Sequence, residues 1–450
     1  MALEPPSPSL QWQPAAMLVP QRPYAPPMPG LSLLDALEPS VQRVLATVVR
    51  AAAPLRVALV GGAVRDLLLH RVHNDPWRGL PDLDLVVEEG GQAAEPPAAH
   101  RVVERLRGTP GAGLGFCQLH PAYGTAELEI DGVVLDLATA RGEGYAHPGA
   151  NPTVFFGSLD DDLARRDLSI NAMALVLADG ALLDPHGGLA DLAARRLRFL
   201  HAGSLSDDPT RLVRAARYGA RLGMDLAPGS RQQWTDTLAR WPWPAAGTVP
   251  SLGTRLRREL ELLLGREPWP QALQLLQGWQ GLALLAPGLQ GDNTWRRRLR
   301  WADRLRAAAD LPGWSPGPWR LLALLAALDD PLPPAQRLQL PQRSLQALRG
   351  LQRLPAGSLP RSPAALSQQL ERKGLPLDAV VLALACGSGP GAPAPGLALR
   401  RGLLRWLLRW RRLPPPCTAA ELLATGLTQG PALGERLRAL RAERLDRERW

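Results

Sequence analysis

Two aspartates lie within an apolar stretch of the chain, and their presence there needs a partner. Asp82 and Asp84 occur in segment 81–87, PDLDLVV, whose other residues suit a buried strand. Successive side chains of a strand point to opposite faces, so the two carboxylates are expected on one face, about 7 Å apart. Gathering charges in an apolar setting is costly unless something neutralises them. The segment therefore predicts a paired arginine, a bound cation or the solvated face of an edge strand.

A glycine turn precedes these aspartates. Segment 57–69, VALVGGAVRDLLL, predicts a strand, a turn at Gly61 and Gly62, and a helix. Glycines allow close backbone approach, and a helix N-terminus offers free N–H groups to an anion. Arg65 lies one turn into the helix, where its guanidinium can reach a triphosphate, and Asp66 can position it. The segment lacks the GxxxxGK[ST] and GxGxxG patterns, so alone it indicates an ordinary strand-to-helix turn.

A third carboxylate, Asp136, lies in the strand-like segment 133–141, VVLDLATAR. Three carboxylates on neighbouring strands, beside a glycine turn that can bind an anion, are typical of two-metal nucleotidyl transfer. Mg²⁺ prefers hard oxygen ligands, and two ions about 3.5–4 Å apart can activate a hydroxyl and stabilise leaving pyrophosphate. The combination predicts that Mg²⁺ neutralises Asp82 and Asp84, and that Asp136 assists the metal or the hydroxyl.

Asp208 and Arg211, in segment 207–214, DDPTRLVR, have the chemistry to select a base. Three residues apart, they are expected to share one face of a helix. A carboxylate accepts and a guanidinium donates, which matches the amino group and ring nitrogen of cytosine or adenine. GTP and UTP would leave polar groups unmatched, at about 1–3 kcal/mol each. Arg214 and Arg217 continue the face at steps of three towards a triphosphate; in isolation they would indicate a solvated charged face.

The elements that position these residues form a mixed head and a helical remainder. Strand-like runs at 56–60, 83–88, 125–130 and 133–138 alternate with helical pieces, which predicts an α/β or α+β head. Beyond about residue 203, Leu, Arg and Ala recur at helical spacing. We expect a Pro-rich, disordered segment at 1–30, a head at 31–200, a helical neck that recognises the base at 201–290, and a helical body and tail that bind RNA at 291–450.

Composition limits the function classes. A chain of 450 residues, 46% apolar and 21% charged, predicts a globular protein of two to four domains. Its three cysteines, Cys117, Cys386 and Cys417, form no CxxC pair, which argues against a zinc site or a disulfide framework and for a cytoplasmic location. No apolar run reaches about 18 residues, so neither secretion nor membrane insertion is expected. The net charge of +10 suits a polyanionic partner.

Segment 401–412, RGLLRWLLRWRR, combines arginines with apolar residues at helical spacing. We interpret it as a packed helix with a basic face towards solvent or RNA. A helix lying on a membrane surface is the alternative.

The motifs in order resemble those of the class II tRNA nucleotidyltransferases and bacterial poly(A) polymerases, from about Val57 to Glu261. The resemblance implies an α+β fold, with a polymerase-β-type nucleotidyltransferase head, a mixed sheet with helices, followed by all-α neck, body and tail domains. Gly61 to Asp66 with Asp82-x-Asp84 resembles the first motif, which implies that the glycines and Arg65 bind the triphosphate and the aspartates bind Mg²⁺. Segment 165–172, RRDLSINA, is similar to the second motif, which implies nucleotide contacts for Arg166, Asp167 and Asn171.

Two later motifs complete the resemblance. Segment 184–192 is similar to a hinge motif, so we interpret His186 as a structural histidine, with a metal or acid–base role as the alternative. Segment 207–214 resembles EDxxRxxR, with Asp207 in place of Glu. We expect that change to affect helix position more than base selection.

Three further segments have weaker matches. Arg255 and Glu259 are similar to residues of the neck helix that supports the EDxxRxxR motif, and segment 419–440 is similar to a C-terminal segment of the family. Segment 141–158 stands where the family has a flexible loop that helps to switch from CTP to ATP, which favours an enzyme that can add A.

The resemblance predicts an Mg²⁺-dependent tRNA nucleotidyltransferase that builds or repairs the 3′-terminal CCA from CTP and ATP without a nucleic-acid template. Its expected partners are the 3′ end and acceptor arm of tRNA. A poly(A) polymerase and a CC-only or A-only enzyme are alternatives within the family. An RNA-binding protein without catalysis is the alternative from another class. The sequence leaves the oligomeric state and the role of the Pro-rich segment open.

Overall fold

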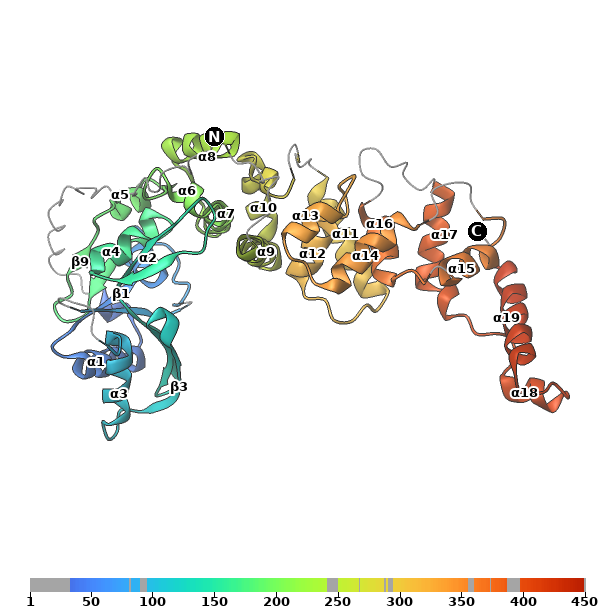
Figure 1. The fold of residues 1–450 in the computed structure, drawn as a ribbon, viewed down its shortest axis with the longest axis horizontal. Helices are drawn as coiled ribbons and strands as arrows, with labels where there is room; N and C mark the ends of the chain where they lie inside the picture. The colour runs from blue at the N-terminus through green and yellow to red at the C-terminus, as the bar shows by residue number, and fades with distance from the viewer. Residues whose placement is uncertain are drawn as a thin grey trace, which may run out of the picture. The chain divides into compact units, whose positions relative to one another are not determined.

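The computed structural model describes residues 33–80, 82–89, 95–240, 250–266, 268–286, 289, 294–354, 360–372, 374–386 and 397–448. The Pro-rich segment 1–30 lies outside the described residues. The chain divides into two compact units (Figure 1). The head unit comprises 1–141, 156–166 and 170–189, and the helical unit comprises 142–155, 167–169 and 190–450. The finer division of the helical part into neck, body and tail stays a prediction.

A seven-stranded mixed sheet forms the centre of the head unit, in the order β3-β4-β5-β2-β1-β8-β9. Only the β2–β5 pair is parallel among the described pairs of this sheet. The four expected strands are confirmed, and β3, β8 and β9 are additional. The strands are β1 (Arg56–Val60), β2 (Asp84–Glu88), β3 (Leu114–His120), β4 (Thr125–Ile130), β5 (Val133–Thr139), β8 (Ala174–Val176) and β9 (Leu182–Leu183).

Helices cover both faces of this sheet. Helices α1 (Pro39–Ala52) and α3 (Ala98–Arg107) pack against each other, and Figure 1 shows them across β1 from α2 (Gly62–His73) and α4 (Leu159–Ala164). On the α4 face, Leu159 and Leu163 join Ala58, Val60 and Val86 in one buried apolar cluster. The alternation of strand side chains explains this, because Ala58 and Val60 point to one face of β1 while Val57 and Leu59 point to the other.

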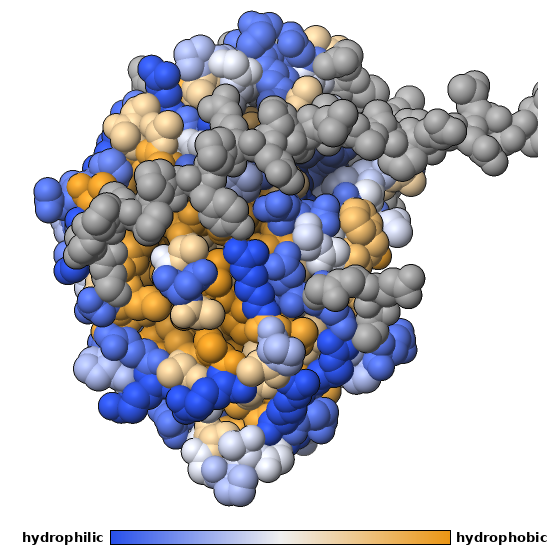
Figure 2. Space-filling view, turned by 90° about the vertical axis from the view of Figure 1, so that its left-hand side faces the viewer, coloured by the Kyte–Doolittle hydropathy of each residue, from blue (hydrophilic) through white to orange (hydrophobic). Residues whose placement is uncertain are grey.

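Figure 2 shows the side of the molecule that lies at the left in Figure 1. Apolar side chains gather in the middle of this view, and hydrophilic side chains surround them. This face is therefore mixed in polarity.

The expected helical remainder is confirmed, since the described chain beyond residue 203 is helical apart from the short strand β11 (Asp225–Leu226). Helices α7, α9 and α10 pack together, and α11 packs against α12 and α16. Trp406 and Trp410 are buried, which supports the packed-helix interpretation of segment 401–412. None of the described helices combines the length and apolarity needed to span a bilayer. The helices are α6 (Ser204–Asp207), α7 (Thr210–Leu222), α8 (Pro228–Arg240), α9 (Pro250–Gly265), α10 (Trp269–Gly278), α11 (Trp295–Ala308), α12 (Pro316–Leu325), α13 (Leu332–Arg337), α14 (Gln342–Gln352), α15 (Pro363–Arg372), α16 (Leu377–Cys386), α17 (Leu397–Leu408), α18 (Ala419–Ala424) and α19 (Pro431–Asp446).

Short elements connect these parts. Helix α5 (Gly188–Ala193) lies where the chain passes between the units. Two-stranded sheets are formed by β6 (Arg141–Gly144) with β7 (Thr153–Phe156) and by β10 (Arg196–Leu197) with β11 (Asp225–Leu226). The 3-10 helices are η1 (Leu34–Ala36), η2 (Pro121–Tyr123), η3 (Ser169–Asn171), η4 (Gly281–Leu284) and η5 (Trp410–Arg412).

Candidate active site

The turn at Gly61 joins β1 to α2, and two charged side chains converge over it. Gly61 has φ 71° and ψ −131°, a left-handed conformation that residues with a Cβ rarely adopt. A Cβ placed there would lie 2.9 Å from Nη1 of Arg166 and 3.7 Å from Oδ2 of Asp84. The absence of a side chain at Gly61 therefore leaves open the space beside both this guanidinium and this carboxylate.

Strand pairing gathers carboxylates on one face of the sheet. Asp84 is in register with Asp136 on the parallel neighbour β5, and Asp136 is in register with Glu127 on β4. Residues in register share a face, so the three form a row. Burial raises the pKa of Asp84, and the charges of Asp136 and Asp82 act in the same direction while Arg166 opposes them. Burial also raises the pKa of Asp136, assisted by Glu127 and Asp82.

Asp82 does not lie in the strand that was expected to hold it. Strand β2 begins at Asp84, because its partner β1 ends at Val60 and the chain turns away at Gly61. The structure therefore corrects the argument that one strand aligns Asp82 with Asp84. Asp82 is an exposed residue just before the strand, and its charge still acts on both Asp84 and Asp136.

The donor set fits a hard divalent cation, although the described residues contain no closed metal cage. No group of three His, Cys, Asp or Glu side chains within the described ranges is close enough to form one, and this includes His186. The carboxylates of Asp82, Asp84 and Asp136 are nevertheless the oxygen ligands that Mg²⁺ prefers. The side chain of Asp84 makes no hydrogen bond or ion pair with any residue that the structure describes. Its raised pKa marks a negative charge that the protein leaves poorly compensated, which a cation would relieve.

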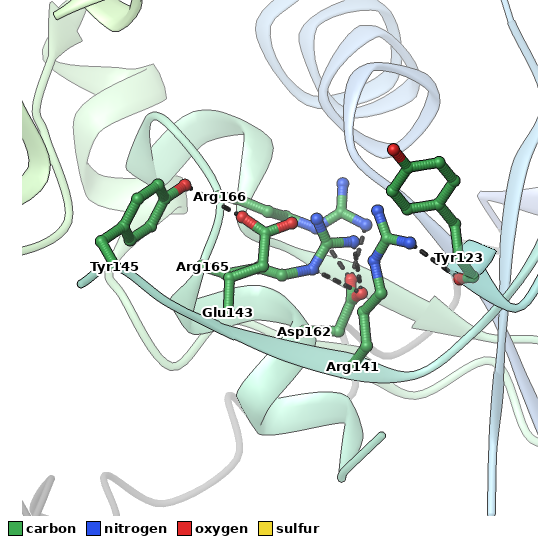
Figure 3. Close-up of polar contacts among 7 residues, drawn as sticks. All are labelled: Tyr123, Arg141, Glu143, Tyr145, Asp162, Arg165 and Arg166. Atoms are coloured by element: carbon green, nitrogen blue, oxygen red, sulfur yellow. Dashed lines mark hydrogen bonds and ion pairs between the residues drawn. The ribbon is translucent and has the colours of Figure 1, made fainter. Parts of the chain in front are cut away.

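Asp162 holds the two arginines of the RRD motif in place (Figure 3). Its Oδ2 accepts hydrogen bonds from Nε and Nη2 of Arg166 at 3.1 and 2.7 Å, and its Oδ1 accepts from Nε and Nη2 of Arg165 at 3.0 and 2.6 Å. Asp162 is fully buried. Burial would raise its pKa, but the charges of Arg166 and Arg165 outweigh that effect and lower it. Asp162 was not among the residues expected from the sequence, although its spacing of three and four residues from the arginines was a visible signal.

Arg65 lies in the core behind the glycine turn, with only 1% of its surface exposed. Its Nε donates to Oδ1 of Asp66 at 2.8 Å, and its Nη1 donates to Oδ1 of Asn171 at 2.6 Å. A Cβ at Gly62 would lie 3.3 Å from Nη2 of Arg65. This placement favours a supporting role for Arg65 and Asn171 beneath the turn over direct contact with a triphosphate.

The expected helical pair of Asp208 and Arg211 does not share one helix. Helix α6 ends at Asp207, α7 begins at Thr210, and Asp208 between them is extended, with φ −145° and ψ 98°. The cause is Pro209, since a proline excludes the helical conformation from the residue before it. Asp208 lies just before Pro209, the N-cap residue of α7, and its Oδ1 accepts a hydrogen bond from the amide of Thr210 at 3.0 Å. Arg211 lies buried in the first turn of α7. The premise of a shared helix face was therefore wrong.

A network of ion pairs fixes α7 against α9 within the helical unit. Arg214 donates from Nε to Oδ2 of Asp167 at 2.8 Å and lies 3.6 Å from Oε1 of Glu259. Arg217 donates from Nη2 to Oε2 of Glu259 at 2.9 Å. The charge of Asp167 raises the pKa of Arg214 above its usual range. These side chains were expected to contact the nucleotide. In the structure, Arg214 pairs with Asp167, and both Arg214 and Arg217 pair with Glu259.

Arg255 of α9 connects the segment after β6 to Asp208. Its guanidinium donates to Oδ1 of Asn151 at 2.9 Å and to the carbonyls of Gly149 and Ala150 at 3.1 and 3.2 Å. Its Nε lies 3.8 Å from Oδ2 of Asp208. The segment that was expected to be a flexible loop is thus tied to the residue that was expected to read the base.

Tyr145 of the same segment is a site residue that sequence reasoning missed. Its hydroxyl donates to Oε2 of Glu143 at 3.0 Å (Figure 3). Burial and the charge of Glu143 raise the pKa of Tyr145 to about 12, while Arg211 opposes the shift and Asp208 adds to it. The charges of the expected base-reading residues therefore act on the Tyr145 hydroxyl.

Comparisons with known proteins agree with this geometry. Residues 57–198 match the family model described as the poly A polymerase head domain. A CC-adding tRNA nucleotidyltransferase of Deinococcus radiodurans is 39% identical over 394 residues, 86% of this chain and 84% of the relative. An A-adding tRNA nucleotidyltransferase of Aquifex aeolicus is 36% identical over 52% of this chain and 26% of its own length. Two solved structures of a CCA-adding enzyme, an apo form and a complex with ATP, are each 25% identical. They cover 93% of this chain and 95% and 94% of theirs, with TM-scores of 0.68 and 0.65.

Proposed function

This chain belongs to the class II tRNA nucleotidyltransferase family, and from that premise we propose that it builds or repairs the 3′-terminal CCA of tRNA from CTP and ATP. The observation that carries the proposal is the convergence of the Asp84 carboxylate and the Arg166 guanidinium over the α-carbon of Gly61. This arrangement offers one group for a cation and one for a phosphate within a few ångströms. Since tRNA is the substrate, we infer that the reaction takes place in the cytoplasm.

The head unit supplies the groups for phosphoryl chemistry. Asp82 and Asp84 would hold Mg²⁺, with Asp136 as a further carboxylate. Mg²⁺ bound there would polarise the α-phosphate and lower the pKa of the attacking ribose hydroxyl. The backbone at Gly61 and Gly62 leaves room for phosphate oxygens to approach the N-terminus of α2.

Arg166 would bind the phosphates of the incoming nucleotide. Asp162 fixes the side chain of Arg166 with two hydrogen bonds and leaves its Nη1 directed towards the space above Gly61. Because this guanidinium is held before substrate arrives, little conformational entropy is lost when it meets a phosphate.

The helical unit supplies base selection. Asp208 offers acceptor oxygens and Arg211 offers donors, the combination that complements cytosine and adenine. Asp208 stands in an extended break between two helices, and its side chain is positioned by the hydrogen bond from the Thr210 amide and by the charge of Arg255. Half-buried Tyr145 carries a hydroxyl whose pKa is raised chiefly by burial and is also shifted by the charges of Arg211 and Asp208, so an uncharged hydrogen-bonding group accompanies the pair.

A CC-only enzyme is the second candidate, and two observations favour it. The Deinococcus radiodurans relative, which matches most of both chains, is a CC-adding enzyme. In addition, Arg255 makes three hydrogen bonds to segment 149–151, which restrains the part of the chain that stands where the family has its ATP-switching loop.

One assay separates these candidates. Transcripts of tRNA that end before the terminal CCA, and after CC, are incubated with CTP, ATP or both, beside an unrelated RNA. We expect C, C and A to be added to the first transcript, with no further extension. Addition of two C residues and none of A would replace the proposal by the CC-only candidate. Long A tracts on either RNA, or no incorporation at all, would overturn it.

A further inference from the structure

Helix α11 (Trp295–Ala308) has two faces of opposite character. Its buried residues, Trp295, Leu299, Ala302 and Leu305, recur at steps of three and four and pack the helix onto its neighbours α12 and α16. At 100° per residue, the exposed positions fall on the opposite side. We call these residues the α11 basic face: Arg296, Arg297, Arg300, Trp301 and Arg304.

The four arginines of this face lack partners within the described part of the chain. None of them makes a hydrogen bond or an ion pair there. Asp303, the one acidic residue of α11, forms an ion pair with Arg320 at 2.9 Å and does not pair with these four arginines. Arg296, Arg300 and Arg304 follow one another at steps of four, a spacing that places like charges side by side and destabilises a helix. A polyanion lying along the face would reverse that repulsion.

We propose that the α11 basic face is a docking surface for the phosphate backbone of tRNA, an inference that rests on the proposed function. Guanidinium groups bind phosphate oxygens with two parallel hydrogen bonds, which suits arginine better than lysine. The face extends about 12 Å from Arg296 to Arg304, at 1.5 Å per residue, so several phosphates can be bound at once. Trp301, 40% exposed beside them, adds an aromatic surface for a ribose or an unpaired base.

The chemistry of the face favours RNA over a membrane. A helix lying on a bilayer buries a broad apolar stripe in the lipid. The apolar stripe of α11 is already buried against the protein, and Trp301 is the one large apolar side chain on the exposed side. The remaining alternative partner is an acidic protein, and the experiment below distinguishes it from RNA.

The test compares two double variants: one removes two arginines from the α11 basic face, and the other removes two exposed arginines from other parts of the protein. The variant is Arg300→Gln/Arg304→Gln, and the control is Arg107→Gln/Arg231→Gln, whose exposed arginines are paired with Glu104 and Asp225. The dissociation constant for tRNA is measured at several salt concentrations without nucleotides. We expect the slope of log Kd against log salt to fall by about 1.5 in the variant, and affinity to drop on the order of tenfold at low salt. Thermal unfolding checks that both proteins are folded.

Two results would overturn the inference. One is a variant whose salt slope equals that of the control. The other is a wild-type protein that binds polyglutamate as tightly as tRNA and loses that binding in the variant, which would assign the face to an acidic protein.

The binding test stands apart from the test of function. At saturating tRNA, the variant should keep the wild-type kcat for CTP incorporation, while its KM for tRNA rises about tenfold. A wild-type protein that incorporates no nucleotide would refute the proposed function and leave the salt slopes to decide the role of α11. A wild-type protein that incorporates CTP, with a variant that binds tRNA normally, would refute the α11 inference alone.

Discussion

Two groups of acidic residues, one in each unit, have opposite surroundings. In the head unit, Asp84 and Asp136 lie side by side, and burial raises the pKa of both. In the helical unit, Asp167 and Glu259 are bound by arginines of α7. Acidic side chains that no ion pair neutralises can receive a cation from solution, whereas acidic side chains that are already paired with arginines hold neighbouring elements together. The comparison therefore separates residues that meet substrate and metal from residues that position others.

Asp84 should produce the largest effect. Replacement by Asn removes the carboxylate nearest to Gly61 and should lower CTP incorporation at least about a hundredfold, the scale of losing an electrostatic group from an active site. Because the carboxylate is poorly compensated in the folded protein, thermal stability should stay equal or rise. Glu129→Gln, which removes an acid from β4 of the same sheet, two strands away, is the control and should keep activity. Retained turnover in Asp84→Asn would contradict the metal assignment.

Asp162 should affect both activity and stability. Asp162→Asn weakens the hold on Arg165 and Arg166, so we expect a free energy of unfolding lower by about 3 kcal/mol. The kcat/KM for CTP should fall about tenfold or more, because Arg166 is no longer held for phosphate. Asp161→Ala on the same helix is the control: it removes a capping box, should cost about 1 kcal/mol, and should leave activity unchanged. Equal activity losses in the two variants would assign Asp162 a purely structural role.

The pH dependence of stability offers a finer test of the same residue. The arginines lower the pKa of Asp162 in the folded protein. A lowered pKa stabilises the fold above the ordinary carboxyl range, and that contribution is lost as the pH falls through the folded pKa. The difference in unfolding free energy between wild type and Asp162→Asn should therefore be largest near neutral pH and shrink below about pH 4. A difference that grows on acidification would contradict this assignment.

Asp208 should affect selection more than rate. With Asp208→Ala, the amino group of cytosine or adenine loses its acceptor, and the preference for CTP over UTP should fall about tenfold to a hundredfold. Stability should fall by about 1 kcal/mol through loss of the hydrogen bond to the Thr210 amide. The measurement is kcat/KM for each nucleotide separately. Uniform loss for all four nucleotides would show that Asp208 does not read the base.

Arg255 should have the smallest effect. Arg255→Met keeps the aliphatic stem but frees segment 149–151 and removes the charge near Asp208. We expect the ratio of ATP to CTP incorporation to shift about threefold to tenfold, a change of roughly 1 kcal/mol. Arg258→Met, an exposed arginine of the same helix, should leave the ratio unchanged. A shift of similar size in both variants would exclude a specific role for Arg255.

Local chemistry in the sequence revealed the fold and most of the candidate residues. The glycine turn, the acidic strand and the order of the motifs can be recognised without coordinates, because each depends on neighbouring residues. Glu127 and Tyr145 could not be found in this way, since their positions depend on strand register and on tertiary packing. The break in the helix at Asp208 could have been predicted, because Pro209 disfavours a helical conformation at the residue before it. The helical spacing of Asp208 and Arg211 was the weaker indication.

The most direct test locates the metal. Crystals grown with CTP and Mn²⁺ in place of Mg²⁺ would show the ion by anomalous scattering. The account predicts a peak coordinated by the carboxylates of Asp84 and Asp82, with the triphosphate of CTP against Gly61 and Arg166. Two results would contradict the metal assignment: a structure in which these carboxylates point apart, or one in which Asp84 forms an ion pair with Arg166 and the metal binds elsewhere.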